Sequence, residues 1–104
     1  MSAMALTERQ LRFLRGKAHP LRPVVMLGAK GLTDNVVAET VQALRDHELI
    51  KVRVRAAGRE QRDALLAALV ARAECTLVTR IGHVAVLYRA AAPLPRLVLP
   101  DAQV

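Results

Sequence analysis

The chain has 104 residues, 53% of them hydrophobic, and its 16 Lys and Arg against nine Asp and Glu give a formal net charge of +7. This length fits one domain with a single packed core and leaves no room for a second. The lone Cys75 excludes a disulfide within the chain, and no apolar run approaches the roughly 18 residues of a membrane span. Because charge begins before any apolar signal region, we expect a cytoplasmic protein.

The positive charge is concentrated in the first third of the sequence. Residues 1–31 carry six Lys and Arg against the single acidic residue Glu8, whereas the later helical stretches mix both signs. Such an excess favours a polyanionic partner, either nucleic acid or an acidic surface. A charge that serves only solubility is the alternative.

The first predicted element is a helix that ends before His19-Pro20. Thr7 and Gln10 fit a capping box, and Leu14 and Ala18 lie on one helical face. The open side of this helix carries the cations Arg9, Arg12 and Arg15.

A strand, a glycine turn and a second helix follow. The apolar run Val24 to Leu27 predicts a buried strand. Thr33 can cap the next helix, which we expect to continue to about Asp46.

The clearest strand pattern covers residues 50–55. Ile50, Val52 and Val54 alternate with Lys51, Arg53 and Arg55, so one face is predicted to be apolar and the other cationic. The cationic row could follow a phosphate backbone, or it could protect an exposed sheet from aggregation.

The remaining elements are a third helix, a hairpin and a tail. Apolar residues recur at helical spacing from Leu65 to Ala73, and Gly82-His83 predicts a two-residue turn between strands 75–81 and 84–88. We therefore expect an α/β fold with the order α-β-α-β-α-β-β and a mixed four-stranded sheet with packed helices, its first two strands parallel. Residues 1–92 form the predicted domain, and residues 93–104 form a Pro-rich tail.

The candidate binding feature is the turn Gly28-Ala29-Lys30-Gly31. Its glycines allow unusual backbone angles and close approach of a ligand, and the following helix start favours anions. The same two glycines could also serve only a tight connection, and Asp34 in the first turn of the helix opposes an anion there. The turn lacks the full nucleotide-binding P-loop pattern. If the first helix lies beside this turn, its arginines, the turn and the strand row form one basic surface.

The sequence gives little support for an enzyme. His19, His47, His83 and Cys75 show no metal-ligand spacing, and Ser2 is the only serine. Cys75 is predicted to be a small core residue. Phe13 and Tyr88 are the only aromatic residues, which argues against an aromatic stacking sheet and favours recognition of backbone and shape.

Several stretches together resemble the CRM domain, the chloroplast RNA splicing and ribosome maturation family, in its stand-alone bacterial YhbY-type form. They are Gly-Lys-Ala-His-Pro-Leu at residues 16–21, the Gly28–Gly31 loop, Glu-Leu-Ile-Lys-Val at residues 48–52, and the closing segment from Ile81 to Arg89. The resemblance covers about residues 6–90.

The resemblance implies a fold similar to the C-terminal domain of translation initiation factor three, and a role in binding ribosomal RNA of large-subunit precursors. The expected RNA-binding residues are Gly28, Ala29, Lys30, Gly31, Arg9, Arg12, Arg15, Lys17, His19, Arg22, Lys51, Arg53 and Arg55. Arg53 and Arg55 rest on the strand pattern alone, and His19 could instead pack within its loop.

The leading hypothesis is a monomeric, non-catalytic RNA-binding protein with no cofactor, metal, membrane partner or small-molecule substrate. The alternative is a basic module that docks on an acidic protein of the translation machinery. An RNA-processing enzyme is a third hypothesis, which the sequence disfavours for want of a catalytic pair.

Overall fold

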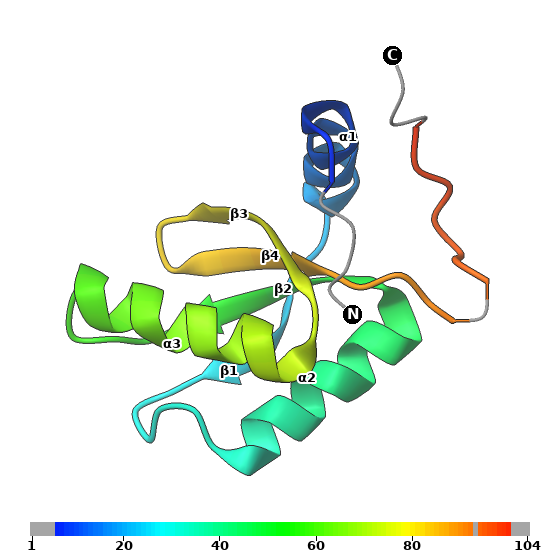
Figure 1. Ribbon diagram of the computed structural model, residues 1–104. Helices are drawn as coiled ribbons and strands as arrows, with labels where there is room; N and C mark the ends of the chain where they lie inside the picture. Colours follow the sequence, from blue (N-terminus) through cyan, green and yellow to red (C-terminus); the bar gives the residue numbers. More distant parts are fainter. Residues whose placement is uncertain (1–5, 93, 101–104) are drawn as a thin grey trace.

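The structure is a computed structural model that describes residues 6–92 and 94–100. Three helices and four strands follow one another along these residues (Figure 1). They are α1 (Glu8–Ala18), β1 (Pro23–Leu27), α2 (Asp34–His47), β2 (Leu49–Val54), α3 (Arg59–Ala73), β3 (Thr76–Ile81) and β4 (Val84–Tyr88). The order α-β-α-β-α-β-β is the predicted one. No helix among the described residues is long and apolar enough to cross a membrane.

The four strands form one mixed sheet in the order β1-β2-β4-β3. β1 and β2 run parallel, joined through α2, while β4 is antiparallel to both β2 and β3. The predicted fold class and the parallel pairing of the first two strands are therefore confirmed. Because β1 and β2 are parallel, their carboxyl ends lie at the same end of the sheet.

The two helix caps that the sequence predicts are both present. Thr7 accepts a hydrogen bond from the backbone N–H of Gln10, and the Gln10 side chain accepts one from the Thr7 N–H, which completes a capping box. Thr33 Oγ1 accepts from the N–H of Val36 at 3.1 Å and begins α2. These local bonds satisfy N–H groups that a helix start leaves without a partner.

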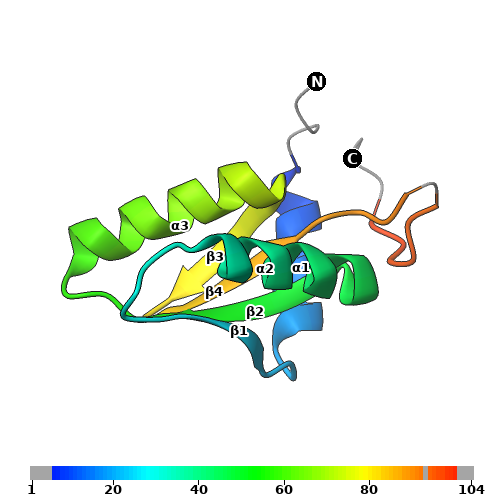
Figure 2. The same ribbon diagram turned by 90° about the horizontal axis from the view of Figure 1, so that it is seen from below.

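Helices cover both faces of the sheet. α2 and α3 lie on one face, and α1 stands on the other (Figures 1 and 2). The larger core joins the sheet to α2 and α3 and includes Leu27, Val52 and Leu69. The smaller core, under α1, includes Leu14 and Val86.

The prediction that the first strand is buried is wrong for half of its side chains. Val25 and Leu27 are buried, but Val24 and Met26 are 55% and 50% exposed. β1 lies at the edge of the sheet, and α1 does not cover its outer face. An apolar run in a parallel strand predicts burial on both faces only when helices cover both faces.

The last described segment packs against the domain. The carboxylate of Glu48, a fully buried residue, accepts hydrogen bonds from the backbone N–H groups of Ala91, Arg96 and Leu97 at 2.6 to 3.0 Å. The Arg96 guanidinium donates to two carbonyls at the end of α2, and Leu97 packs on the core under α1. Residues 94–100 thus follow the surface of the domain.

Glu48 combines burial with a lowered pKa. Burial raises the pKa of this carboxyl, but the three backbone hydrogen bonds and the charge of Arg96 together bring the pKa below the ordinary value of 4.5. Glu48 is therefore charged at pH 7 and ties the last segment to the end of α2.

Candidate nucleic-acid interface

The Gly28–Gly31 loop is a tight turn at the carboxyl end of β1. The N–H of Gly31 donates to the carbonyl of Gly28 at 3.0 Å, and Gly31 has a φ of +77°. Of the two loop glycines, only Gly31 lies in the left-handed region, where a side chain costs free energy. The backbone at Gly28 suits residues other than glycine, so the conformation of the turn does not explain why this residue lacks a side chain.

Arg55 lies next to this loop because the two parallel strands end together. The Arg55 N–H donates to the carbonyl of Leu27 at 2.8 Å, immediately before the loop. Arg53 pairs with Met26 in the register of β1 and β2. Arg53 and Arg55 of the predicted cationic row are therefore neighbours of the predicted glycine loop, although at least 22 positions separate them from it in the sequence.

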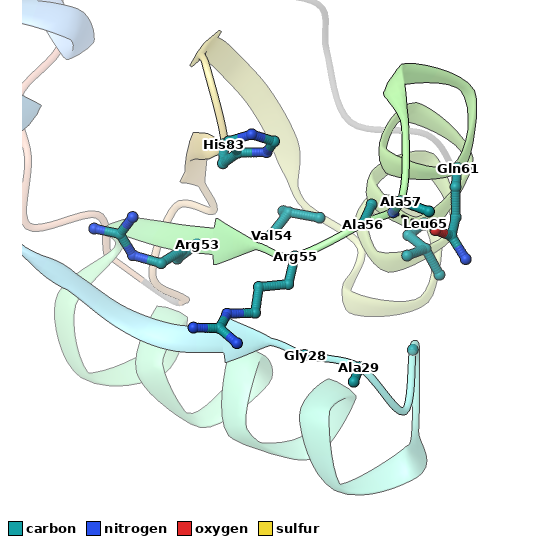
Figure 3. A pocket seen from close by; sticks show the side chains of 11 residues that line it. Gly28, Ala29, Arg53, Val54, Arg55, Ala56, Ala57, Gln61, Leu65 and His83 are labelled. Carbon is teal, nitrogen blue, oxygen red and sulfur yellow. Dashed lines mark hydrogen bonds between the residues drawn. The ribbon is translucent and has the colours of Figure 1, made fainter.

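A cavity of about 640 Å³ opens between the loop and this row. Figure 3 shows Arg53, Arg55 and His83 on one side of the opening, and the loop with the start of α3 on the other. The lining residues are Gly28, Ala29, Gly31, Arg53, Val54, Arg55, Ala56, Ala57, Gln61, Leu65 and His83. Lys30, at the tip of the turn, is exposed outside this lining.

The cations at this end of the sheet are not neutralised by carboxylates. Among residues 6–92 and 94–100, Lys30, Arg53 and Arg55 have no acidic oxygen within 4.0 Å. Asp34, the acidic residue after the loop, instead pairs with Arg72 of α3 at 2.7 Å. The guanidinium of Arg72 partly offsets the negative charge of Asp34. Asp34 therefore repels an anion at the start of α2 less than an unpaired carboxylate would.

A second group of predicted residues gathers where α1 meets β1. Lys17 and Arg22 line a cavity of about 380 Å³ together with Leu21 and other side chains. The ammonium group of Lys51 donates to the carbonyl of His19 at 3.3 Å, so the strand row begins beside the end of α1. Lys51 thus stands between this group and the cavity beside the loop.

The arginines of α1 lie apart from the loop. α1 stands on the sheet face opposite α2, and the loop joins β1 to α2 (Figure 1). Arg9 and Arg12 are exposed, and Arg15 lies 3.8 Å from Glu8 on its own helix. None of these three arginines lines either of the two cavities described above. A single basic surface that includes both α1 and the loop would require them to be side by side, and they are not.

Six residues that line the cavity are absent from the predicted contacts. They are Val54, Ala56, Ala57, Gln61, Leu65 and His83. The N–H of Val54 donates to the carbonyl of His83 at 2.7 Å, which holds the hairpin turn against the end of β2. The position of His83 could have been inferred from the length of the turn. A two-residue turn between β3 and β4 places His83 opposite the end of β2.

Chemistry other than binding finds little support in these residues. Within the part of the chain that the structure describes, no three His, Cys, Asp or Glu side chains gather as a metal site would require. Burial raises the pKa of the Cys75 thiol to about 11, partly opposed by the charge of Arg89. Cys75 packs against the larger core, as a small apolar residue does.

These features define a small α/β domain with an exposed glycine loop and a row of unneutralised cations at one end of its sheet. The sequence matches the model of the CRS1/YhbY (CRM) domain over residues 6–89. The chain belongs to this family, which confirms the resemblance seen in its motifs.

Individual relatives and a solved structure agree with this assignment. The chain is 50% identical over 84 residues to a protein of Haemophilus influenzae named "RNA-binding protein", covering 81% of this chain and 85% of that one. It is 39% identical over 95 residues to the Bacillus subtilis protein named "Probable RNA-binding protein YqeI", covering 91% and 99%. The solution structure of a Staphylococcus aureus protein, described as a putative RNA binding protein, superposes with a TM-score of 0.78 at 31% identity, covering 92% and 100%.

Proposed function

We propose that this CRM-domain protein is a non-catalytic RNA-binding protein that acts in the cytoplasm as a monomer. The observation that carries the proposal is the cluster of the glycine loop, Arg53 and Arg55 around one opening, where the described residues place no carboxylate to neutralise it. The names of the relatives in Haemophilus influenzae and Bacillus subtilis support RNA as the polyanion.

The proposed contact is with the phosphate backbone. The glycines of the loop allow a phosphate to approach the backbone closely, Lys30 offers a mobile ammonium at the tip, and Arg53 and Arg55 offer planar guanidinium groups. This surface extends toward the end of α1 through Lys51, Lys17, Arg22 and His19. Secondary contacts with a large RNA are proposed for the residues outside it, Arg9, Arg12 and Arg15.

We propose ribosomal RNA in precursors of the large subunit as the target. This step rests on the resemblance to stand-alone YhbY-type proteins, and on a surface that suits a structured RNA better than a bare single strand. Only two aromatic residues are present in the chain, so stacking of successive bases on aromatic rings has little to build on.

A salt titration of binding to large-subunit ribosomal RNA tests the proposal. We expect affinity to fall steeply with salt, because each phosphate contact releases counterions. The double variant R53A/R55A is expected to lower the slope of log affinity against log salt by about 0.7 to 0.9 for each phosphate that the variant no longer neutralises. Lys30→Ala is expected to weaken binding to different RNA sequences equally.

Arg45→Ala is the control matched in charge to Lys30→Ala, because Arg45 lies in the last turn of α2, away from the loop that precedes this helix. It removes one charge and is expected to leave the slope nearly unchanged. Affinity that is independent of salt, or the same decrease of slope in R45A as in R53A/R55A, would contradict the proposed surface. Nuclease treatment before sedimentation with ribosomal particles separates RNA binding from docking on an acidic protein, since only docking survives removal of accessible RNA.

A further inference from the structure

The cavity beside the glycine loop offers more than a phosphate contact. We propose that it accepts one unpaired nucleobase of the RNA whose phosphates lie on the loop and on Arg53 and Arg55. The inference rests on the proposed function, and it names a site within the bound RNA that phosphate contacts do not require.

The size and lining of the cavity suit a nucleobase. Its volume of about 640 Å³ lies within the range of about 300 to 1,000 Å³ typical of sites for small organic ligands. Val54, Ala56, Ala57 and Leu65 form apolar parts of the lining. A row of phosphates gains nothing from such a lining, whereas an unstacked base removes its apolar faces from water there.

Planar groups stand at the rim. Guanidinium planes and imidazole rings are surfaces on which unstacked RNA bases stack, besides Phe, Tyr and Trp. Arg53, Arg55 and His83 all line the opening (Figure 3). The bond from the Val54 N–H to the His83 carbonyl keeps His83 at this position. The scarcity of Phe, Tyr and Trp therefore does not exclude stacking of a single base.

A hydrogen-bond donor is available at the opposite wall. Gln61 Oε1 accepts from the N–H of Ala57 at 2.7 Å, which orients the amide and holds the connection before α3. The Nε2 group of Gln61 donates to no atom of residues 6–92 and 94–100. It can donate to a ring nitrogen or carbonyl on the edge of a base.

Gly28 leaves the entrance open. Its backbone does not require glycine, and a Cβ added there meets no heavy atom within 4 Å. A side chain at this position would therefore extend the cavity lining without disturbing the fold. The lack of a side chain at Gly28 therefore matters only when a ligand, such as the proposed nucleobase, comes close to the backbone there.

The test compares a hairpin RNA that carries an internal bulge of unpaired nucleotides with a fully paired duplex of the same length. The variant Ala57→Leu enlarges a side chain of the cavity lining without changing charge, and Ala57 lies outside the loop and the cations that are proposed to bind phosphates. We expect A57L to weaken binding to the bulged RNA about tenfold, within the range that one stacked base contributes. Binding to the duplex and the salt slope for both RNAs are expected to stay as in the wild type, since the phosphate contacts remain.

The corresponding change in the RNA is to replace each nucleotide of the bulge in turn by an abasic nucleotide, which removes the base and keeps the phosphate. At one position, the abasic RNA is expected to bind the wild type about tenfold more weakly than the intact bulged RNA does. A57L is expected to bind the abasic RNA and the intact bulged RNA equally. His83→Ala is expected to weaken binding to the bulged RNA, whereas His83→Phe, which keeps a ring, is expected to preserve it. If a thermal scan shows that A57L is unfolded at the assay temperature, Ala56→Leu replaces it as the filling variant.

The outcomes distinguish a failure of the proposed base site from a failure of the proposed RNA-binding function. Equal weakening on the bulged RNA and the duplex, or no weakening on either, overturns the base site while RNA binding stands. Weaker binding of A57L to the abasic RNA than to the intact bulged RNA also overturns it. A wild-type protein that binds neither RNA, or binds both independently of salt, overturns the proposed function itself.

Discussion

The backbone N–H of Arg55 lies 2.8 Å from the carbonyl oxygen of Leu27, the last residue of β1. This bond joins the carboxyl ends of the two parallel strands and brings the residue after β2 to the residue before the glycine loop. The charge of Arg55, which follows β2, and the glycine backbone of the loop, which follows β1, thus meet at one end of the sheet. A phosphate placed there would contact both.

The shape of the loop depends on Gly31 far more than on Gly28. Gly31→Ala is expected to destabilise the protein by about 1 to 2 kcal/mol, because φ at this position is +77° and a Cβ is disfavoured there. Gly28→Ala is expected to change the free energy of unfolding by less than about 0.5 kcal/mol. Urea denaturation of both variants measures the difference, and equal effects would mean that the turn has a different backbone conformation.

Glu48 should dominate the acid sensitivity of the fold. Its folded-state pKa is lowered, so its contribution to stability is present above the ordinary value of 4.5 and is lost as pH falls through the folded-state value. Glu48→Gln is expected to cost about 2 to 3 kcal/mol at pH 7, because an amide accepts with one oxygen and presents N–H groups to backbone donors.

The same pair of proteins gives the pH dependence. Urea denaturation from pH 7 downward is expected to show the difference in stability between wild type and E48Q shrinking below pH 4.5, as the wild-type carboxyl becomes neutral. A difference that stays constant with pH would show that Glu48 stabilises the fold by packing and not by its charge.

The last described segment should contribute to stability and couple to Glu48. A variant that ends at Ala92 lacks the N–H groups of Arg96 and Leu97 and the packing of Leu97 and Leu99. We expect its free energy of unfolding to be lower by about 2 to 4 kcal/mol in urea denaturation. Adding E48Q to this variant is expected to cost less than E48Q in the full chain, since two donors are already gone.

Strict additivity of the truncation and E48Q would show that the segment and Glu48 act independently. No decrease in stability on truncation would show that residues 1–92 are a self-sufficient domain.

Cys75 should react slowly in the folded protein. Its pKa of about 11, against an ordinary 9.0, leaves about 100-fold less thiolate near pH 8 than in an unfolded chain. Alkylation by iodoacetamide, followed by mass spectrometry with and without urea, is expected to show at least this ratio. Equal rates in the two conditions would mean that the start of β3 opens readily.

Local patterns in the sequence were sufficient for most of the fold. The capping box of Thr7 and Gln10, the cap at Thr33 and the alternation around Val52 depend on neighbours within a few residues, so a linear pattern reveals them. The turn at Gly82-His83 is equally local. The family resemblance rests on such stretches in their order, and the match to the CRM domain confirms it.

Other features depend on which strands are neighbours. A period of two assigns side chains to faces but does not say that β1 lies at an edge, so the exposure of Val24 and Met26 could not be predicted from it. The separation of α1 from the loop likewise follows from the sheet face on which α1 packs. Glu48 belongs to one of the stretches that carry the resemblance, yet the backbone groups that it binds are more than 40 residues away.

The sequence by itself determined the element order, the caps, the net charge and the glycine loop, because each depends on residue type and short-range spacing. Only the tertiary structure decided what surrounds that loop. The parallel pairing of β1 and β2 brings Arg53 and Arg55 to it, and the hairpin register adds His83. Strand order and register are set by packing across the whole core, which no local pattern encodes.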